Sequence, residues 1–346
     1  MERRPVKPTE TRVEFRADNA LAEFEESLTV KLGEVGLPVE NVYVCLHERA
    51  IVYNGIENIL TKLNCATRKK SLYLSKMIAA SGVGLFDAAL NYLWNEVVTS
   101  LRERVSQFDL QYFFEVATSN QDSRKHLKSE RDLARIDDAS LLEGARKIGL
   151  LDQTGYKRLD HIRYMRNFAS AAHPNQVEVN GHDLLAWTRT CIEEVLNSKK
   201  DKIVAETGKL LANIKKSRLT KDEVESAAAF FGNLPQERAD SLAKGLFGLY
   251  VADGRTENVA DNVRMLWPKL WPEVSEDLRR GFGVRHARLK ASADTDAADA
   301  ARELIDLVDG SQYLNEEIRV VEIDKALDHL LSTHKGYDNF YREPSA

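Results

Sequence analysis

The sequence predicts an all-α protein in which an antiparallel helical bundle is followed by a second, irregular or solenoid-like helical domain. Its 346 residues include only 8 prolines and 18 glycines, so long stretches contain no residue that interrupts a helix. Apolar side chains recur at helical spacing along most of these stretches. A chain of this length also exceeds the size at which one hydrophobic core usually stops growing, so we expect two domains.

The first helices can be placed from apolar spacing and from stop signals. The N-terminal residues are polar, and a moderately amphipathic helix then covers 21–32. It ends at Gly33, with Pro38 beyond, which is the usual order of residues after a helix. Helical spacing resumes over 41–63, and a further helix is expected at 71–80.

The segment 84–105 is the most apolar of the chain. Its apolar residues follow the i, i+3, i+4, i+7 pattern over about six turns, so we expect this helix in the core. Asp87, Asn91 and Asn95 recur every four residues and form one polar stripe along it. The stripe either faces solvent or borders a functional site, and the solvent-facing interpretation is favoured.

The elements that follow are less uniform. Residues 107–117 are rich in Phe and Tyr and form a strand or a short helix, because periodicity does not separate the two. Residues 120–135 are strongly charged, which indicates a surface loop or short helices. Longer helices are expected at 139–149, 155–173 and 182–197, and the first of these closes with a glycine.

A charge run after residue 197 marks the expected domain boundary, because the helical segments become shorter beyond it. It divides the chain into an N-terminal extension with one helix (1–39), a helical bundle (40–199) and a C-terminal helical domain (200–346). Thr220 and Glu223 have the spacing of a capping box within this last domain. No fixed repeat period is present, so no repeat family is predicted. Its helices are expected at 203–215, 220–231, 235–252, 258–270, 272–290, 295–309 and 316–333.

Composition argues against several classes of function. A net charge of −5 opposes the indiscriminate attraction to nucleic acid that strongly basic proteins show, although it leaves a local basic groove open. Cys45, Cys65 and Cys191 form no Cys-x-x-Cys pair, so we expect reduced, mostly buried thiols. No secretory signal begins the chain, and no run approaches the roughly 20 apolar residues that span a membrane. We therefore expect a cytoplasmic protein without membrane contact, metal or cofactor.

The chemically informative residues lie at the end of the helix expected at 155–173. Arg166 and His173 are seven residues apart, about two helical turns, so both side chains emerge from one face. Arg163, three residues before Arg166, joins that face and is expected to bind phosphate, and Asn167 lies about 100° further around the helix. The following Pro174 ends or kinks the helix.

This residue set suits one reaction in particular. The helix dipole favours a charged His173, whereas the two neighbouring arginines oppose it, and a histidine balanced in this way suits proton transfer. Arginine is permanently charged and can stabilise a phosphorane through paired hydrogen bonds, while Asn167 can orient either the histidine or the phosphate. In RNA cleavage the attacking 2′-OH belongs to the substrate, so these groups are sufficient without a metal. The pattern therefore favours cleavage of an RNA phosphodiester.

Arg166 and Asn167, followed by five residues and then His173 late in a helical bundle, resemble the signature of the HEPN superfamily. The resemblance covers about 40–200, because one more amphipathic helix follows the motif as that fold requires. It implies a small antiparallel bundle that forms a homodimer with a composite, metal-independent ribonuclease site. It also implies that Arg166, Asn167 and His173 are the catalytic residues. Many members of the family are toxins or anti-phage defence effectors.

Two other classes of function stay open. The first is a non-catalytic helical scaffold that binds protein or RNA. The second is a DNA-binding regulator, against which the acidic balance and the lack of a clear helix-turn-helix both weigh. A regulatory protein partner is possible for the C-terminal domain. Trp267 and Trp271, four residues apart, either stack on bases or pack in the core, and core packing is favoured.

Overall fold

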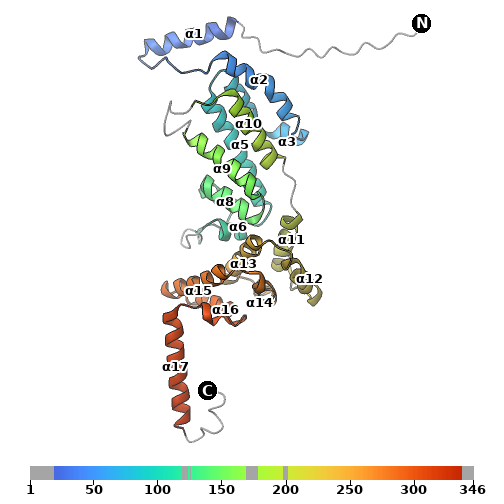
Figure 1. Ribbon diagram of the computed structural model, residues 1–346, viewed down its shortest axis with the longest axis vertical. Coiled ribbons are helices and arrows are strands. Elements are labelled where there is room, and N and C mark those ends of the chain that lie inside the picture. Colours follow the sequence, from blue (N-terminus) through green and yellow to red (C-terminus); the bar gives the residue numbers. More distant parts are fainter. Residues whose placement is uncertain (1–18, 119–123, 125, 169–177, 198–201, 337–346) are drawn as a thin grey trace, which may run out of the picture. The chain divides into compact units, whose positions relative to one another are not determined.

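The computed structural model describes residues 19–118, 124, 126–168, 178–197 and 202–336, and helices are its only regular elements in these ranges (Figure 1). The all-α class predicted from sequence is therefore confirmed for this part of the chain. The ambiguous segment 107–117 forms a helix, α6 (Leu110–Ala117). Asp109 begins it, because its carboxylate accepts a hydrogen bond from the Tyr112 N–H at 2.9 Å.

Contacts divide the chain into two compact units. Unit 1 comprises Met1–Glu103 and Leu151–Lys199, and unit 2 comprises Arg104–Leu150 and Lys200–Ala346. The division after Lys199 coincides with the charge run seen in the sequence. The segment 104–150, however, groups with the C-terminal residues, although sequence spacing had included it in the bundle range 40–199. The three domain ranges themselves stay predictions.

Unit 1 is built around one long helix that runs through its core. Of the helix α5 (Phe86–Ser106), the residues up to Glu103 belong to this unit. Its apolar face is buried. On the polar stripe Asp87 and Asn95 are exposed and Asn91 is half-buried, which agrees with the solvent-facing interpretation for two of the three residues. The other helices are α1 (Asn19–Glu34), α2 (Leu46–Leu60), α3 (Cys65–Lys70), α4 (Leu72–Gly82), α9 (Gln153–Asn167) and α10 (Gly181–Cys191), the last continued by a π-helical turn (Ile192–Leu196).

Helices α2 and α10 pack closely because glycines remove side chains from the contact. A Cβ on Gly55 would lie 2.5 Å from Leu185, and one on Gly181 would lie 2.5 Å from the Glu48 carbonyl oxygen. The Gly181 N–H also donates to the Glu48 carboxylate at 2.6 Å. This hydrogen bond connects the start of α10 to α2 and so positions the helix that follows the predicted motif.

A buried arginine connects α1 to the rest of unit 1. Arg49 on α2 is 2% exposed, donates to the Val44 carbonyl at 2.6 Å and forms an ion pair with Glu25 of α1. Its guanidinium passes where a Cβ on Gly84 would lie, and Gly84 has the positive φ of 83° that favours glycine. The single carboxylate of Glu25 thus offsets this buried charge.

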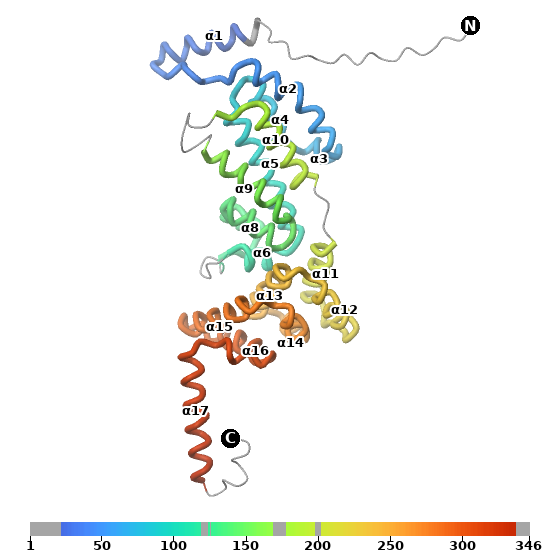
Figure 2. Tube along the Cα trace, in the orientation of Figure 1, coloured from blue at the N-terminus to red at the C-terminus, as the bar shows by residue number. Residues whose placement is uncertain are grey.

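Unit 2 contains the remaining helices, whose path can be followed in Figure 2. The expected capping box at Thr220 and Glu223 is present at the start of α12, and Gly149 ends α8 with a left-handed φ of 91°. Besides α6 these elements are a 3₁₀ turn (Glu130–Arg135), α8 (Asp138–Ile148), α11 (Lys202–Lys216), α12 (Lys221–Phe231), α13 (Gln236–Val251), α14 (Glu257–Leu270), α15 (Glu276–Ala291), α16 (Thr295–Asp306) and α17 (Glu316–His334).

The central helix of unit 2 is α13, whose second half is buried. A Cβ on Gly245 would lie 2.0 Å from the Tyr112 ring, so α6 packs directly on the α13 backbone. On α14, Trp267 is 1% exposed and lies among Phe247 and Phe282. Core packing is therefore confirmed for this tryptophan.

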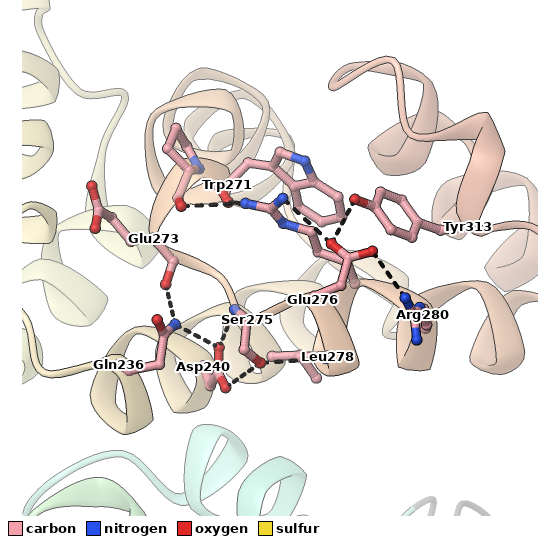
Figure 3. Close-up of polar contacts among 11 residues, drawn as sticks. Gln236, Asp240, Trp271, Glu273, Ser275, Glu276, Leu278, Arg280 and Tyr313 are labelled. Atoms are coloured by element: carbon pink, nitrogen blue, oxygen red, sulfur yellow. Dashed lines mark hydrogen bonds and ion pairs between the residues drawn. The ribbon is translucent and has the colours of Figure 1, made fainter.

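Polar contacts connect α13 to the start of α15 (Figure 3). The carboxylate of Asp240 accepts from the Ser275 N–H at 2.8 Å and from its hydroxyl at 2.6 Å, which fixes the residue that caps α15. The Gln236 amide donates to the backbone carbonyl of Glu273, in the turn before α15, at 2.5 Å. Tyr313 donates to Glu276 at 3.0 Å, so the chain before α17 is held against α15.

The structure bears on two expectations from composition, the burial of the cysteines and the lack of a membrane-spanning segment. Cys45 and Cys65 are exposed, and of the three cysteines Cys191 is the buried one, so the prediction of mostly buried thiols is wrong. The reason is that Cys45 and Cys65 lie at helix starts on the surface, whereas Cys191 lies on the inner face of α10. No helix within the described residues is both long and apolar enough to cross a membrane.

Candidate functional site

The predicted site lies at the C-terminal end of α9. Arg163 and Arg166 are on this helix, and Asn167 is its last residue. His173 lies outside the described residues, so two of the three motif side chains can be placed. Helix α9 begins where the Asp152 carboxylate accepts from the Gly155 N–H at 2.7 Å, and it buries Leu159 and Ile162.

The two described motif residues contact each other. The Arg166 Nη1 donates to the Asn167 Oδ1 at 2.7 Å, and both side chains are half-buried. Neighbouring residues on a helix point about 100° apart, so the long arginine side chain curves back to reach the amide. The bond occupies the amide oxygen of Asn167, and its Nδ2 is the group that can donate to an anion.

A core tryptophan lies beneath this pair. The Arg166 guanidinium carbon is 5.9 Å from the centre of the Trp94 ring, and Trp94 of α5 is fully buried. A guanidinium at this distance is attracted to the negative face of the ring. The sequence predicted Trp94 as a core residue but did not reveal this contact, because 72 positions separate the two residues and no local pattern relates them.

Arg163 has a different environment from Arg166. Its Nε and Nη2 both donate to one carboxylate oxygen of Asp160, at 2.9 and 2.7 Å. The predicted phosphate-binding role would therefore require that a phosphate displace Asp160. The spacing of three residues between Asp160 and Arg163 is the signal that could have predicted this pair from sequence.

Arg158, earlier on α9, is also paired with a carboxylate. Arg158 donates to Glu194, in the turn after α10, at 2.9 Å. The C-terminal end of α9 further carries an aromatic pair, Tyr164 and Phe168, with ring centres 4.6 Å apart, and Tyr164 is half exposed. Arg166 is in the last turn, where the helix dipole favours a cation.

Helix α10 begins with its own polar contact. Asn180 accepts from the Asp183 N–H at 2.8 Å, and the amide of Asn180 donates to the Asp183 carboxylate at 2.7 Å. Asp183 is therefore engaged in the first turn of α10. Across the described ranges, no group of three or more His, Cys, Asp or Glu side chains is arranged to hold a metal ion.

Comparisons with known proteins add no relative. No family model, no curated protein and no solved structure matches the chain. A functional interpretation therefore depends on the residues and their geometry.

Proposed function

We propose that this chain is a metal-independent endoribonuclease of the HEPN type, acting as a homodimer, with the role of a regulated toxin or anti-phage effector. The observation that supports it is the hydrogen bond between Arg166 and Asn167 at the end of α9, above the Trp94 ring. Oxyanion stabilisation is most effective when the donors are held before the reaction begins. A guanidinium confined between an aromatic ring and an amide meets that requirement.

Each motif residue has a defined role in this proposal. His173 accepts the proton of the substrate 2′-OH, whose oxygen attacks phosphorus, and the bond from phosphorus to the 5′-oxygen breaks. Arg166 binds the phosphorane oxygens, and the Nδ2 of Asn167 donates to the phosphate. The 5′-oxygen leaves with a proton, and the other product ends in a 2′,3′-cyclic phosphate.

A second copy of the chain would complete the site. In-line cleavage is best served by both a proton acceptor and a proton donor, whereas one chain supplies one motif histidine. A two-fold axis beside α9 would bring a second His173 and Arg166 to the same phosphate. A protein that stays monomeric and fully active at nanomolar dilution would contradict this part of the proposal.

The decisive experiment is incubation of the purified protein with total RNA in the presence of EDTA. We expect cleavage that leaves 2′,3′-cyclic phosphate ends, and a loss of at least about 100-fold in His173→Ala and in Arg166→Ala. Arg166→Lys should also cleave poorly, because an ammonium cannot make paired contacts. The matched control is Arg158→Ala, which removes an arginine of the same helix.

Two results would contradict the proposal. Activity that disappears in EDTA and returns with Mg²⁺ would exclude the mechanism, and wild-type cleavage by His173→Ala would exclude the site. Circular dichroism of every variant should show unchanged helix content, so that loss of activity is not loss of fold.

The pairing of Arg158 and Arg163 with carboxylates favours a second candidate, a non-catalytic helical scaffold that binds protein or RNA. Ion-paired arginines present less net charge to a phosphate backbone. The same incubation separates the two candidates, because a scaffold would leave the length of the RNA unchanged.

A further inference from the structure

A cavity of about 350 Å³ lies within unit 2, and its charged residues point to a ligand. Helices α6, α13, α15 and α16 each contribute to its wall, with Phe114, Val251 and Leu289 among the apolar lining residues. This volume is at the lower end of the range for small-molecule sites, and the mixture of apolar walls with a few polar groups is typical of them.

One carboxylate in this wall serves two arginines. The Glu115 Oε2 lies 2.5 Å from the Arg124 Nη1 and 3.1 Å from the Arg285 Nη2. The side chains are 13%, 11% and 17% exposed in the same order, so the charges are largely removed from water. In this cluster one carboxylate is thus shared by two guanidiniums, and Lys128 in the same wall adds a third cation.

Both guanidiniums have hydrogen-bonding capacity beyond Glu115. Each guanidinium carries five N–H donors in a planar fork that matches carboxylate or phosphate oxygens. The Nε of Arg285 is buried and has no hydrogen-bond partner among the described residues. Burial lowers the pKa of Arg285, because desolvation disfavours its charged form. An anion in the cavity would supply the missing acceptor.

Gly248 of α13 shows how closely this cluster is packed. A Cβ on Gly248 would lie 2.2 Å from the Glu115 carboxyl carbon, so the carboxylate lies directly on the helix backbone. The Arg285 guanidinium carbon lies 4.9 Å from the centre of the buried Phe247 ring. The carboxylate and this guanidinium are thus held by contacts from α13 that restrict their movement.

Two further carboxylates, Asp253 and Asp294, line the same cavity. Asp253 follows α13, and Asp294 precedes α16. Carboxylates accept hydrogen bonds from ammonium or hydroxyl groups and disfavour a second anionic group. The cavity therefore offers donors to one end of a small molecule and acceptors to another.

We propose that this cavity binds a small zwitterionic molecule, whose single acidic group, a phosphate or a carboxylate, contacts Arg124 and Arg285. Its ammonium group contacts Asp253. This assignment is independent of the chemistry proposed for α9, since each of its residues belongs to unit 2.

Calorimetric titration of the full chain tests the assignment with two pairs of probes. The phosphate pair is O-phosphoethanolamine and inorganic phosphate, and the carboxylate pair is γ-aminobutyrate and acetate. We expect the zwitterion of one pair to bind at least about tenfold more tightly than its simple anion. The pair that binds identifies the acidic group.

Variants then locate the site. Arg285→Met and Arg124→Met should each weaken binding of the preferred zwitterion about tenfold or more, because each removes a charge-assisted hydrogen bond. The matched control is Arg288→Met, which removes an exposed arginine from the same helix and should bind as the wild type does. If Arg285→Met fails to fold by circular dichroism, Arg124→Met decides alone, since it leaves the second guanidinium on Glu115.

Three outcomes would overturn the proposal. They are no binding of any probe below about 10 mM, equal affinity for zwitterion and simple anion in both pairs, and wild-type affinity in Arg124→Met.

Discussion

The arginines of α9 in unit 1 and those of the cavity in unit 2 differ in how many carboxylates they have. Arg158 and Arg163 each have a carboxylate of their own, at 2.9 and 2.7 Å, and lie at the surface. Arg124 and Arg285 share Glu115 and are largely buried. In the first arrangement each guanidinium has its own carboxylate, whereas in the second one carboxylate serves two guanidiniums.

This difference shows that the number of arginines is a poor guide to where an anion binds. The sequence drew attention to the cluster of cations in 155–173, yet Arg158 and Arg163 of that segment each pair with a carboxylate, whereas Arg166 contacts a ring and an amide. In unit 2 no local motif marks Glu115, Arg124 and Arg285, although one largely buried carboxylate there pairs with two largely buried guanidiniums. Exposed pairs contribute little to stability, and buried charges contribute or cost much more.

The largest expected effect comes from removing the shared carboxylate. Glu115→Gln leaves two buried guanidiniums side by side, so we expect the free energy of unfolding to fall by about 3 kcal/mol. Urea denaturation followed by circular dichroism measures this change. Glu225→Gln is the matched control, because Glu225 of α12 pairs with Lys269 at the exposed surface of the same unit. Equal losses in the two variants would show that sharing has no special importance.

A smaller effect is expected at a buried base of unit 2. His286 of α15 is 4% exposed, and its Nδ1 has no hydrogen-bond partner in the described part of the chain. Desolvation lowers the pKa of His286. The positive charges of Arg302 and Lys290 lower this pKa further, whereas the carboxylates of Glu322 and Asp306 raise it.

The sign of the resulting pH dependence follows from this direction. The folded protein keeps His286 neutral, whereas the unfolded chain binds a proton below about pH 6.5. The stability that His286 contributes is therefore fully present above that pH. It is lost as the pH falls toward the lowered pKa of His286 in the folded protein. Urea midpoints between pH 7.5 and 5.5 should decline more steeply for the wild type than for His286→Gln. Parallel declines would contradict this account of the histidine.

The smallest effect is expected at the surface pair of α9. Asp160→Asn should change the free energy of unfolding by less than about 0.5 kcal/mol, because both partners of the pair are partly exposed. It should also strengthen RNA binding in a gel-shift assay, because Arg163 then becomes available to phosphate. Glu194→Gln, which releases Arg158 in the same way, provides the comparison. A loss of RNA cleavage as large as that of Arg166→Ala would instead place Asp160 in the reaction itself.

The sequence by itself determined most helices of the described part of this protein, with α6 as an exception. Helix ends depend on neighbours a few residues apart, such as Thr220 with Glu223 and the glycine after α8, so local patterns were sufficient to place them. The apolar face of α5 followed in the same way from its spacing. The pairing of Arg166 with Asn167 was also within reach of the sequence, since the two residues are neighbours.

Tertiary structure decided which of these residues meet residues far along the chain. It determined that Leu110–Ala117 is a helix, because that segment packs against α13, and that two of the three cysteines are exposed. It placed Trp94 beneath Arg166 and brought Glu115 between Arg124 and Arg285. Such contacts depend on how distant helices pack, and periodicity along one helix carries no information about its neighbour's side chains.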